Sequence, residues 1–326
     1  MSRVGLCGVL AITEGMYLLK KSPDKTVIQD ISLELGVDPS FIEKDWFAVQ
    51  LLILISGLQS SKGVKTVFSG GTSLSKGYGL IKRFSEDLDF ILTIPDGISL
   101  SAGQRRAFRK EVVSSIQNDE RFSIDETKVL RGDSHRFFKI PIQYNRFFEG
   151  SFLRPHLQLE MTFMELKRSA RPRNICSIVS EVVQTEAELK IDCVSAIETA
   201  GDKLSALTWR ILVRDRADEK DDPTVIRHLH DLAALENTII DAGKDFVSSA
   251  KESLEIDKNR RGGNVIADML IPDRLANALK ILKEDGLYQK EYTQFVESMS
   301  YAAEDEVIGF DEALEALERI IGVYNQ

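Results

Sequence analysis

The spacing of apolar residues changes partway along the chain, and this change limits the folds that the chain can adopt. Up to about residue 175, short apolar runs with strand spacing alternate with helical segments. From Asp192 onward, almost every segment has helical spacing. The regular strand–helix alternation of a doubly wound sheet is missing. We therefore expect an α+β fold, with a mixed β-sheet in a domain over residues 1–175 and a helical domain over residues 176–326.

Helical spacing also runs from Ile28 to Leu58, and Asp38-Pro39-Ser40 is a typical helix start within it. Residues 167–174 carry four basic residues and a proline, and we expect a linker or exposed loop there. The expected strands are 64–68, 87–94, 122–129, 137–144 and 156–163. The other expected helices are 73–82, 104–117, 192–212, 225–241, 245–254, 276–282, 288–303 and 311–321.

Charge and cysteine content exclude some classes of protein. Of the 326 residues, 51 are acidic and 42 basic, and the net charge of −9 excludes a protein that coats nucleic acid by bulk charge. Cys7, Cys176 and Cys193 are odd in number and widely spaced, which argues against a disulfide framework or a zinc knuckle. We expect a cytoplasmic protein. The apolar run 4–13 is too short to span a membrane, and we expect it to form a buried helix or strand.

The first motif with chemical meaning is Ser69-Gly70-Gly71-Thr72-Ser73-Leu74-Ser75-Lys76. A strand here leads into two glycines and then a helix rich in hydroxyl groups. Glycines allow backbone N–H groups to approach a phosphate, and a helix N-terminus favours anions. We expect Gly70, Gly71, Thr72, Ser73 and Lys76 to bind a polyphosphate. The alternative is a plain tight turn, and the spacing excludes a Walker A loop.

The second motif, Arg83-Phe84-Ser85-Glu86-Asp87-Leu88-Asp89-Phe90, places two carboxylates on one face of a strand. Asp87 and Asp89 repel each other unless a cation lies between them. Mg²⁺ suits such a pair, because it prefers oxygen ligands and leaves positions for substrate phosphates. The alternative for the two residues alone is a solvated acidic edge. Their position soon after the two glycines favours the Mg²⁺ site.

A third carboxylate, Glu160, lies on the polar face of the strand expected at 156–163, whose other face is apolar. Metal-assisted phosphoryl transfer commonly uses a third carboxylate, which takes the proton of the attacking hydroxyl or holds a second metal. The alternative is an exposed strand glutamate.

The fourth feature is a set of charged residues on two consecutive helices. Lys203, Arg210 and Arg214 return to one side of the first helix and could face a triphosphate. Asp231, on the second helix, could orient Lys203 or Arg210. The alternative is a solvated charged face. His228 and His230 are two residues apart, which is the wrong spacing for zinc ligands on one helix face.

These motifs, in this order, resemble the AbiEii/AbiGii toxin family of nucleotidyltransferases, which belongs to the DNA-polymerase-β-like superfamily and includes relatives of the MenT toxins. The resemblance rests on Gly70-Gly71-Thr72-Ser73-Leu74, Arg83-Phe84-Ser85-x-Asp87-x-Asp89, Lys203 with Arg210, and Arg227 with Asp231. Residues 42–46 also resemble a segment that precedes the two glycines in this family. The resemblance runs from about residue 35 to residue 236.

The resemblance implies a polymerase-β-like core whose active-site cleft is completed by Lys203 and Asp231 from the helical domain. Asp87 and Asp89 would bind Mg²⁺, and Glu160 would be the third acid. Nucleotide binding would involve the glycine motif with Ser85, Lys203 and Arg210. An acceptor hydroxyl would attack the α-phosphorus of an NTP. The acceptor would be the 3′ end of a tRNA, which would stop translation, and a cognate antitoxin protein would control the toxin.

Other functions remain open from the residues alone. The same scaffold could serve a protein nucleotidylase, a kinase-like phosphotransferase, a non-enzymatic nucleotide-binding regulator or, with less support, a glycosyltransferase. Two basic groups could contact the phosphates of an RNA acceptor, although solvation alone also explains them. They are Lys167, Arg168, Arg171 and Arg173, and Arg105, Arg106, Arg109 and Lys110.

Overall fold

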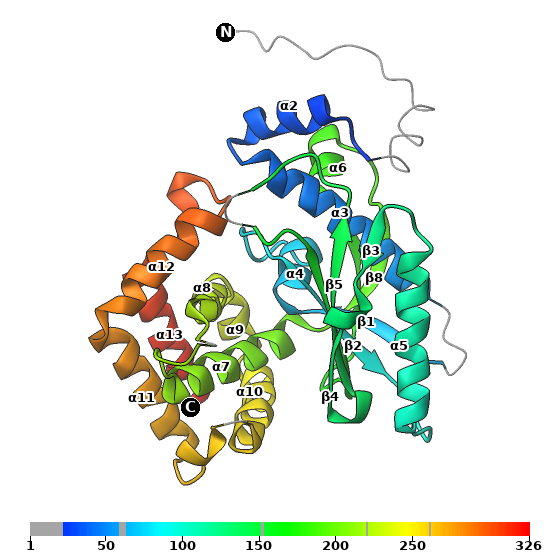
Figure 1. Ribbon diagram of the computed structural model, residues 1–326. Coiled ribbons are helices and arrows are strands. Elements are labelled where there is room, and N and C mark those ends of the chain that lie inside the picture. Colours follow the sequence, from blue (N-terminus) through cyan, green and yellow to red (C-terminus); the bar gives the residue numbers. More distant parts are fainter. Residues whose placement is uncertain (1–21, 59–62, 151–152, 220, 261) are drawn as a thin grey trace, which may run out of the picture.

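The computed structural model describes residues 22–58, 63–150, 153–219, 221–260 and 262–326. Figure 1 shows two parts side by side, one built on a β-sheet and the other made of helices α7 to α13. This architecture confirms the expected α+β class. The apolar run 4–13 and Cys7 lie outside the described residues. Among the residues that are described, no helix has the length and apolar character needed to cross a membrane.

In the described part of the chain, eight strands form one mixed sheet in the order β3-β5-β6-β2-β1-β8-β7, and β4 pairs with β5 outside this path. The pairs β2–β6 and β1–β8 are parallel, and the other pairs are antiparallel. The strands are β1 (Lys65–Ser69), β2 (Asp87–Thr93), β3 (Phe122–Ile124), β4 (Leu130–Gly132), β5 (Phe137–Tyr144), β6 (Leu157–Phe163), β7 (Arg171–Ile175) and β8 (Leu189–Cys193).

Alternation along the two central strands, β2 and β6, decides which side chains face the core. Every second residue is apolar and buried in the main core: Leu88, Phe90 and Leu92 on β2, and Leu157, Leu159 and Met161 on β6. Helices α3 (Pro39–Ser56) and α5 (Ala102–Gln117) contribute apolar side chains to the same core and cover this face. The opposite face therefore presents Asp87, Asp89 and Glu160.

Helix α3 is buried almost all round, as expected for a helix with apolar residues on every side. It begins as predicted, with the Asp38 side chain accepting a hydrogen bond from the Ser40 N–H at 2.9 Å and Pro39 in the first turn. Helices α2 (Lys25–Leu35) and α6 (Ile178–Val183) pack beside it (Figure 1). After β1, helix α4 (Gly70–Lys76) starts at the first glycine and is shorter than predicted.

The helical part is organised around α7 (Ala196–Val213), which contacts helices α8, α10 and α11. A second apolar core joins these helices. The remaining helices are α8 (Arg227–Ala234), α9 (Glu236–Ala242), α10 (Lys244–Ile256), α11 (Ile271–Glu284), α12 (Gly286–Met299) and α13 (Phe310–Tyr324), and a 3₁₀ turn, η3 (Pro223–Ile226), precedes α8.

The sheet extends further along the chain than the sequence suggests. The linker expected at 167–174 is wrong in its second half, because β7 forms there at the edge of the sheet, where Pro172 costs little. Strand β8 follows, with Ile191 and Cys193 buried and Lys190 and Asp192 exposed. The sheet thus continues past residue 175, and α7 begins at Ala196 rather than Asp192. The strand expected at 122–129 is also shorter, because a 3₁₀ turn occupies Glu126–Lys128.

Candidate active site

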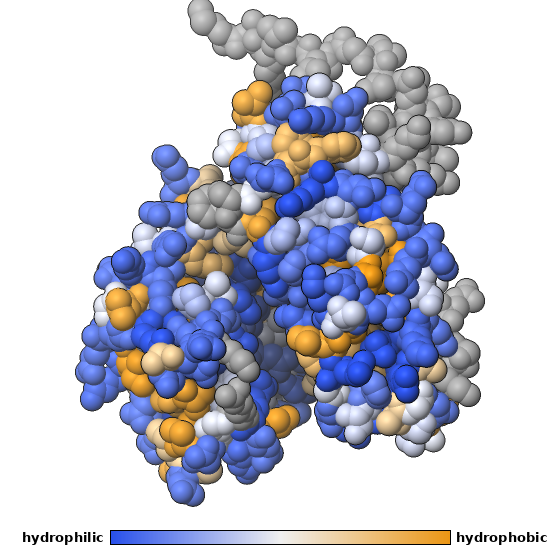
Figure 2. Space-filling view, in the orientation of Figure 1, coloured by the Kyte–Doolittle hydropathy of each residue, from blue (hydrophilic) through white to orange (hydrophobic). Residues whose placement is uncertain are grey.

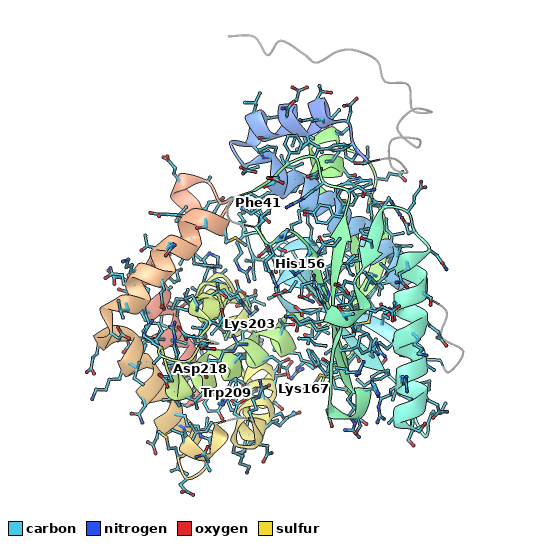
Figure 3. The ribbon with its side chains drawn as sticks, viewed as in Figure 1. Phe41, His156, Lys167, Lys203, Trp209 and Asp218 are labelled. Carbon is cyan, nitrogen blue, oxygen red and sulfur yellow. The ribbon has the colours of Figure 1, made fainter. Side chains whose placement is uncertain are left out.

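A cleft between the sheet part and the helical part gathers most of the predicted site residues. Figure 2 shows the surface hollowed between the two parts, and Figure 3 shows Lys203 on the side of the helical part that faces the sheet. The sheet wall includes Gly70, Gly71, Ser85, Asp87, Asp89, Lys139, Arg154 and Glu160. The helical wall includes Lys203, Arg210, Asp222, Arg227, His228, Arg260, Phe295 and Met299.

The register of the sheet brings the three predicted carboxylates together. Asp89 on β2 lies directly beside Glu160 on β6, and Glu160 lies directly beside Lys139 on β5. Asp87 is two residues before Asp89 and therefore on the same face. The Glu160 carboxylate accepts a hydrogen bond from Lys139 Nζ at 2.5 Å, and the Asp87 carboxylate accepts one from Arg154 Nη2 at 2.7 Å.

Asp89 differs from these two neighbours because no described side chain forms an ion pair with it. Burial, and then the nearby carboxylates of Asp87 and Glu160, raise the pKa of Asp89 to about 7. The charges of Lys203 and Arg227 act against this shift but do not cancel it. The sheet wall thus holds one carboxylate whose charge is uncompensated, at the point where Asp87 and Glu160 also converge.

Gly70 and Gly71 line the cleft where β1 turns into α4, and both are required by close packing. Gly70 has a φ of +74°, and a Cβ atom there would lie 2.0 Å from Asp89 Oδ2. A Cβ atom on Gly71 would lie 2.8 Å from Arg83 Nη2. The two glycines therefore let Asp89 and Arg83 approach the turn, in addition to any contact with a ligand.

Three predicted nucleotide-binding residues do not face the cleft. The Thr72 hydroxyl donates to the Asp87 carbonyl at 2.5 Å, and the Ser73 hydroxyl donates to the Gly70 carbonyl at 3.0 Å. Lys76 points to the other side of α4 and pairs with Asp45 of α3 at 2.5 Å. The Thr72 side chain thus fastens the glycine turn to β2, the Ser73 side chain bonds within the turn, and the Lys76 side chain is paired with α3.

On the helical wall, Lys203 is held by a buried carboxylate. Lys203 Nζ lies 2.5 Å from Asp231 Oδ2, and Arg83 donates two hydrogen bonds of 2.7 Å to the same carboxylate. Burial lowers the pKa of Lys203. Burial alone would raise the pKa of Asp231, but Arg83 and Lys203 hold it well below the usual range. Asp231 thus lies within hydrogen-bond distance of Lys203, as its predicted orienting role requires, and Arg83 is a second partner of the same carboxylate.

The cationic stripe predicted on α7 is only partly present. Arg210 lines the cleft and pairs with Asp222 at 2.8 Å, rather than with Asp231. Arg214 is absent from the cleft lining and pairs with Asp221 and Glu291. Arg227 lines the cleft instead, beside His228. Burial, together with the nearby cations Lys203, Arg227 and Arg210, lowers the pKa of His228 well below its usual value, so this ring is neutral.

The two basic groups proposed for RNA contacts lie outside the cleft lining. Lys167 pairs with Asp202 at 2.6 Å, and Arg168 pairs with Asp245 at 3.2 Å. The Arg173 guanidinium lies over the ring of Tyr78, 4.3 Å from its centroid. On α5, Arg105 donates to the carbonyl of Ser134 at 3.0 Å. Several of these side chains therefore have structural partners.

Sequence reasoning did not assign roles to Arg83, Lys139 or Arg154, which contact the predicted carboxylates. Arg83 stands in the quoted motif, but its partner Asp231 is 148 positions away. Lys139 lies on the polar face of a predicted strand, and the β5–β6 register alone places it beside Glu160. No local sequence pattern around Arg154 indicates that it belongs to the site.

The family comparison matches most of the chain. The family model described as "Nucleotidyl transferase AbiEii toxin, Type IV TA system" matches residues 53–316. The match extends well past residue 236, where the resemblance was expected to end, and begins after the segment 42–46. A search of the curated proteins finds no match.

Two solved structures are similar over nearly the whole chain at low identity. MenT4, a nucleotidyltransferase toxin from Mycobacterium tuberculosis H37Rv, shares 16% identity, with 91% of this chain and 98% of that chain covered and a TM-score of 0.49. A STING-associated CdnE c-di-GMP synthase from Capnocytophaga granulosa shares 11% identity, with 97% and 92% covered and a TM-score of 0.28. These scores are too low to support conclusions. The family match covers more than half of the chain, and the chain therefore belongs to the AbiEii family of nucleotidyl transferase toxins.

Proposed function

We propose that this toxin is a Mg²⁺-dependent nucleotidyltransferase that transfers a nucleoside monophosphate from an NTP to an acceptor hydroxyl in the cleft. The observation that carries the proposal is the uncompensated carboxylate of Asp89, which lies beside Asp87 and Glu160 and faces Lys203 across the cleft. On the sheet wall, Asp89 lacks a cationic partner among the described side chains. On the helical wall, the Lys203 ammonium faces the cleft. Such a cleft suits a metal–polyphosphate complex, whose metal and phosphates would compensate both.

The donor set fits Mg²⁺ that arrives with a substrate. Within the described ranges, no group of three or more His, Cys, Asp or Glu side chains forms a metal site by itself. Mg²⁺ in nucleotide enzymes is commonly held by one or two carboxylates together with phosphate oxygens and water. Asp87 and Asp89 would hold the ion. When bound, Mg²⁺ would neutralise phosphate charge and polarise the α-phosphoryl group.

Lys203 and the glycine turn would bind the phosphates. The Lys203 ammonium is fixed by Asp231, so its position is set before the nucleotide binds. Arg210 and Arg227 border the same wall and add positive charge. Gly70 and Gly71 expose the backbone at the start of α4 to the cleft. These groups contribute positioning and charge stabilisation, which are the main needs of phosphoryl chemistry.

Glu160 would accept the proton of the attacking hydroxyl. The new bond joins the acceptor oxygen to the α-phosphorus, and the bond from the α-phosphorus to the bridging oxygen breaks. Pyrophosphate leaves, and the acceptor proton passes to Glu160. The hydrogen bond from Lys139 at 2.5 Å fixes this carboxylate beside Asp89.

For the acceptor we propose the 3′ end of tRNA, which would block translation in the cytoplasm, with a cognate antitoxin protein as the controlling partner. Membership of a family described as a Type IV toxin–antitoxin system supports the toxin and antitoxin roles. The cationic residues of the helical wall support a nucleic-acid acceptor as well as the NTP.

The proposal is tested by incubating the protein with Mg²⁺, total tRNA and each α-³²P-labelled NTP, followed by a denaturing gel. We expect label on tRNA with one preferred NTP, and no label when EDTA is present. Label on protein would identify a protein nucleotidylase. Label that transfers only from γ-³²P-NTP would identify a kinase-like phosphotransferase. Bound NTP without transfer to any acceptor would favour a regulator.

A further inference from the structure

Arg154 is anchored more firmly than an ordinary arginine in a cleft wall. Its backbone N–H donates to Glu86 Oε1 at 2.5 Å, and its carbonyl accepts a hydrogen bond from Lys44 Nζ at 2.8 Å. Its side chain donates from Nε to Glu86 Oε2 at 3.2 Å and from Nη2 to Asp87 Oδ1 at 2.7 Å. Both the main chain and the guanidinium of Arg154 are therefore fixed before they reach Asp87.

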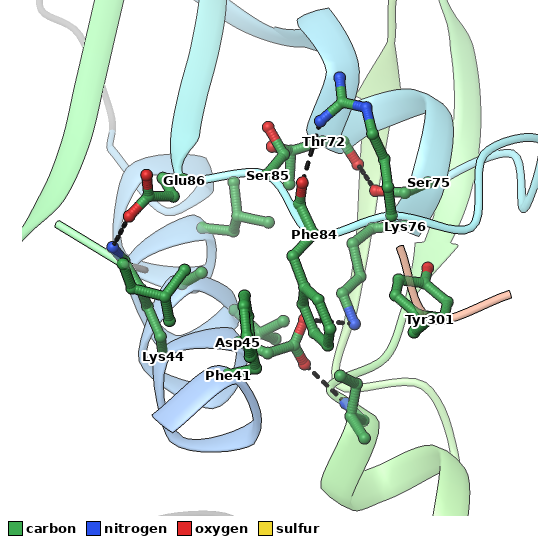
Figure 4. Close-up of a pocket in the computed structure, with 16 residues that line it drawn as sticks. Phe41, Lys44, Asp45, Thr72, Ser75, Lys76, Phe84, Ser85, Glu86 and Tyr301 are labelled. Atoms are coloured by element: carbon green, nitrogen blue, oxygen red, sulfur yellow. Dashed lines mark hydrogen bonds and ion pairs between the residues drawn. The ribbon is translucent and has the colours of Figure 1, made fainter. Parts of the chain in front are cut away.

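The support for Arg154 comes from helix α3. Lys44 is 4% exposed, and its Nζ lies 2.5 Å from Glu86 Oε1. Figure 4 shows this ion pair. Burial lowers the pKa of Lys44, and Glu86 opposes this shift. A buried lysine is costly unless it is paired, and here its ammonium fastens both Glu86 and the main chain at residue 154. Lys44 does not line the large cleft, so its effect on the cleft passes through these two residues.

The residues next to Lys44 on α3 also hold neighbouring parts of the chain in place. Both of these residues have partners. Glu43 accepts hydrogen bonds from the backbone of residues 147 and 148, and Asp45 pairs with Lys76 and accepts a hydrogen bond from the Ile178 N–H. Figure 4 shows Asp45 and Lys76 on one side of this region and Lys44 and Glu86 on the other. The polar residues of α3 thus fix the surroundings of the cleft from behind the sheet wall.

We propose that Arg154 is a positioning residue for Asp87, held by Lys44 and Glu86. Arg154 occupies Asp87 Oδ1 and leaves Oδ2 for a divalent cation in the cleft. A guanidinium can bridge two carboxylates because its donors form a rigid fork, which a lysine ammonium lacks. This inference rests on the proposed function, since it concerns the same metal site, but it also gives a role to Lys44, which lies before the family match over residues 53–316.

The test measures metal binding directly, by the electron paramagnetic resonance signal of free Mn²⁺ during titration, with and without α,β-methylene-ATP. We expect Arg154→Met to weaken Mn²⁺ binding at least about tenfold, as is usual for groups that orient metal ligands. Arg154→Lys, which keeps the charge but loses the fork, should also weaken it. Arg146→Met is the matched control, because Arg146 has similar exposure (35% against 37%) and a surface partner, Glu149.

Each outcome decides the matter. Unchanged or tighter Mn²⁺ binding in Arg154→Met overturns the positioning role, and tighter binding would mean that Arg154 competes with the metal for Asp87. Wild-type affinity for Mn²⁺ in Arg154→Lys would show that charge alone matters, and would overturn the claim that the forked geometry of the guanidinium is needed. Failure of the wild-type protein to bind Mn²⁺ would overturn the metal site itself, together with this inference. Lys44→Met, if its thermal unfolding stays cooperative, should show a smaller weakening than Arg154→Met; wild-type binding there would overturn the support from α3.

Discussion

The two walls of the cleft carry opposite imbalances of charge. On the sheet wall, Glu86, Asp87 and Glu160 form ion pairs with Lys44, Arg154 and Lys139, whereas Asp89 forms none with any described side chain. On the helical wall, Asp231 is shared between two cations, Arg83 and Lys203. One wall is therefore short of a positive charge at Asp89, and the other has an excess positive charge at Lys203.

This difference teaches how the site is prepared for its ligand. Asp89 and Lys203 both line the cleft, among charged side chains that already have partners. The sheet wall is completed by adding a cation, and the helical wall is completed by adding an anion. A metal–polyphosphate complex supplies both, so the walls can be tested separately.

The largest effect is expected on the sheet wall. Asp87→Ala and Asp89→Ala should each lower nucleotidyl transfer by about 10³-fold or more, because the loss of a metal ligand removes several kcal/mol of charge stabilisation. Folding should survive, since each change removes a like-charge repulsion. Asp192→Ala, an exposed acid on β8, is the control. The α-³²P assay and circular dichroism check the prediction; normal transfer by both variants would contradict it.

A different result is expected on the helical wall, where stability depends on the buried carboxylate. Asp231→Asn leaves Arg83 and Lys203 buried without their counter-ion, and should lower the free energy of unfolding by about 3–5 kcal/mol. Asp222→Asn, which breaks a half-exposed pair with Arg210, should cost at most about 1 kcal/mol. Urea unfolding measures both, and equal costs would mean that the buried cluster is not special.

Lys203→Ala separates binding from folding on the same wall. Asp231 keeps its two hydrogen bonds from Arg83, so the loss of stability should be smaller than for Asp231→Asn. The KM for the NTP should rise about 10–100-fold, because the fixed ammonium no longer meets the phosphates. Steady-state kinetics with the preferred NTP test this. A collapse of thermal stability with unchanged KM would make Lys203 structural.

Gly70→Ala tests how tightly the glycine turn fits the sheet wall. The added Cβ would meet Asp89 Oδ2 at 2.0 Å, and φ is already +74°. Gly79→Ala is the matched control, because Gly79 has a φ of +63° and open space around its Cβ position. Backbone strain of about 1 kcal/mol is common to both variants. In Gly70→Ala alone, we expect the free energy of unfolding to fall by about a further 1 kcal/mol, and metal binding to weaken. Equal losses of stability in the two variants would show that the contact with Asp89 has no effect.

The smallest effect is a dependence of stability on pH in the absence of metal. The pKa of Asp89 is raised to about 7, so the folded protein holds a proton that the unfolded chain releases near pH 4. Stability should therefore fall as pH rises from 5 to 8, by about 1 kcal/mol after allowance for solvent screening. In the Asp89→Asn variant, the stability should not show this fall of about 1 kcal/mol between pH 5 and 8. Urea midpoints in EDTA at four pH values measure it, and parallel curves for the two proteins would contradict it.

Local patterns predicted the parts of the site that depend on neighbouring residues. Period-two spacing placed Asp87 and Asp89 on one face and Glu160 on the polar face of its strand, and the structure confirms both placements. The nearness of Glu160 to Asp89 depends on the parallel pairing of β2 with β6, which no local pattern specifies. The face of Lys76 could not be predicted, because it depends on Asp45, far away on α3.

Long-range partners also explain the other differences. Arg214 does not join the predicted cationic stripe because it forms ion pairs with Asp221 and Glu291. Strands β7 and β8 were missed because they are short and β7 is rich in basic residues, and they exist only through pairing with each other and with β1. Arg154 joins the site through partners 67 and 68 positions away in the chain.

The bond between Arg83 and Asp231 has a consequence for the synthesis of this toxin. A ribosome releases the chain from its N-terminus, and the sheet part, complete at Cys193, emerges well before α8. Until residue 231 has emerged, Arg83 lacks its carboxylate and Lys203 lacks the group that orients it. A partly made chain therefore carries the carboxylates proposed to bind metal, without the assembled wall proposed to bind phosphate. The dependence on a late residue would keep a harmful enzyme inactive while it is still attached to the machinery that it is proposed to stop.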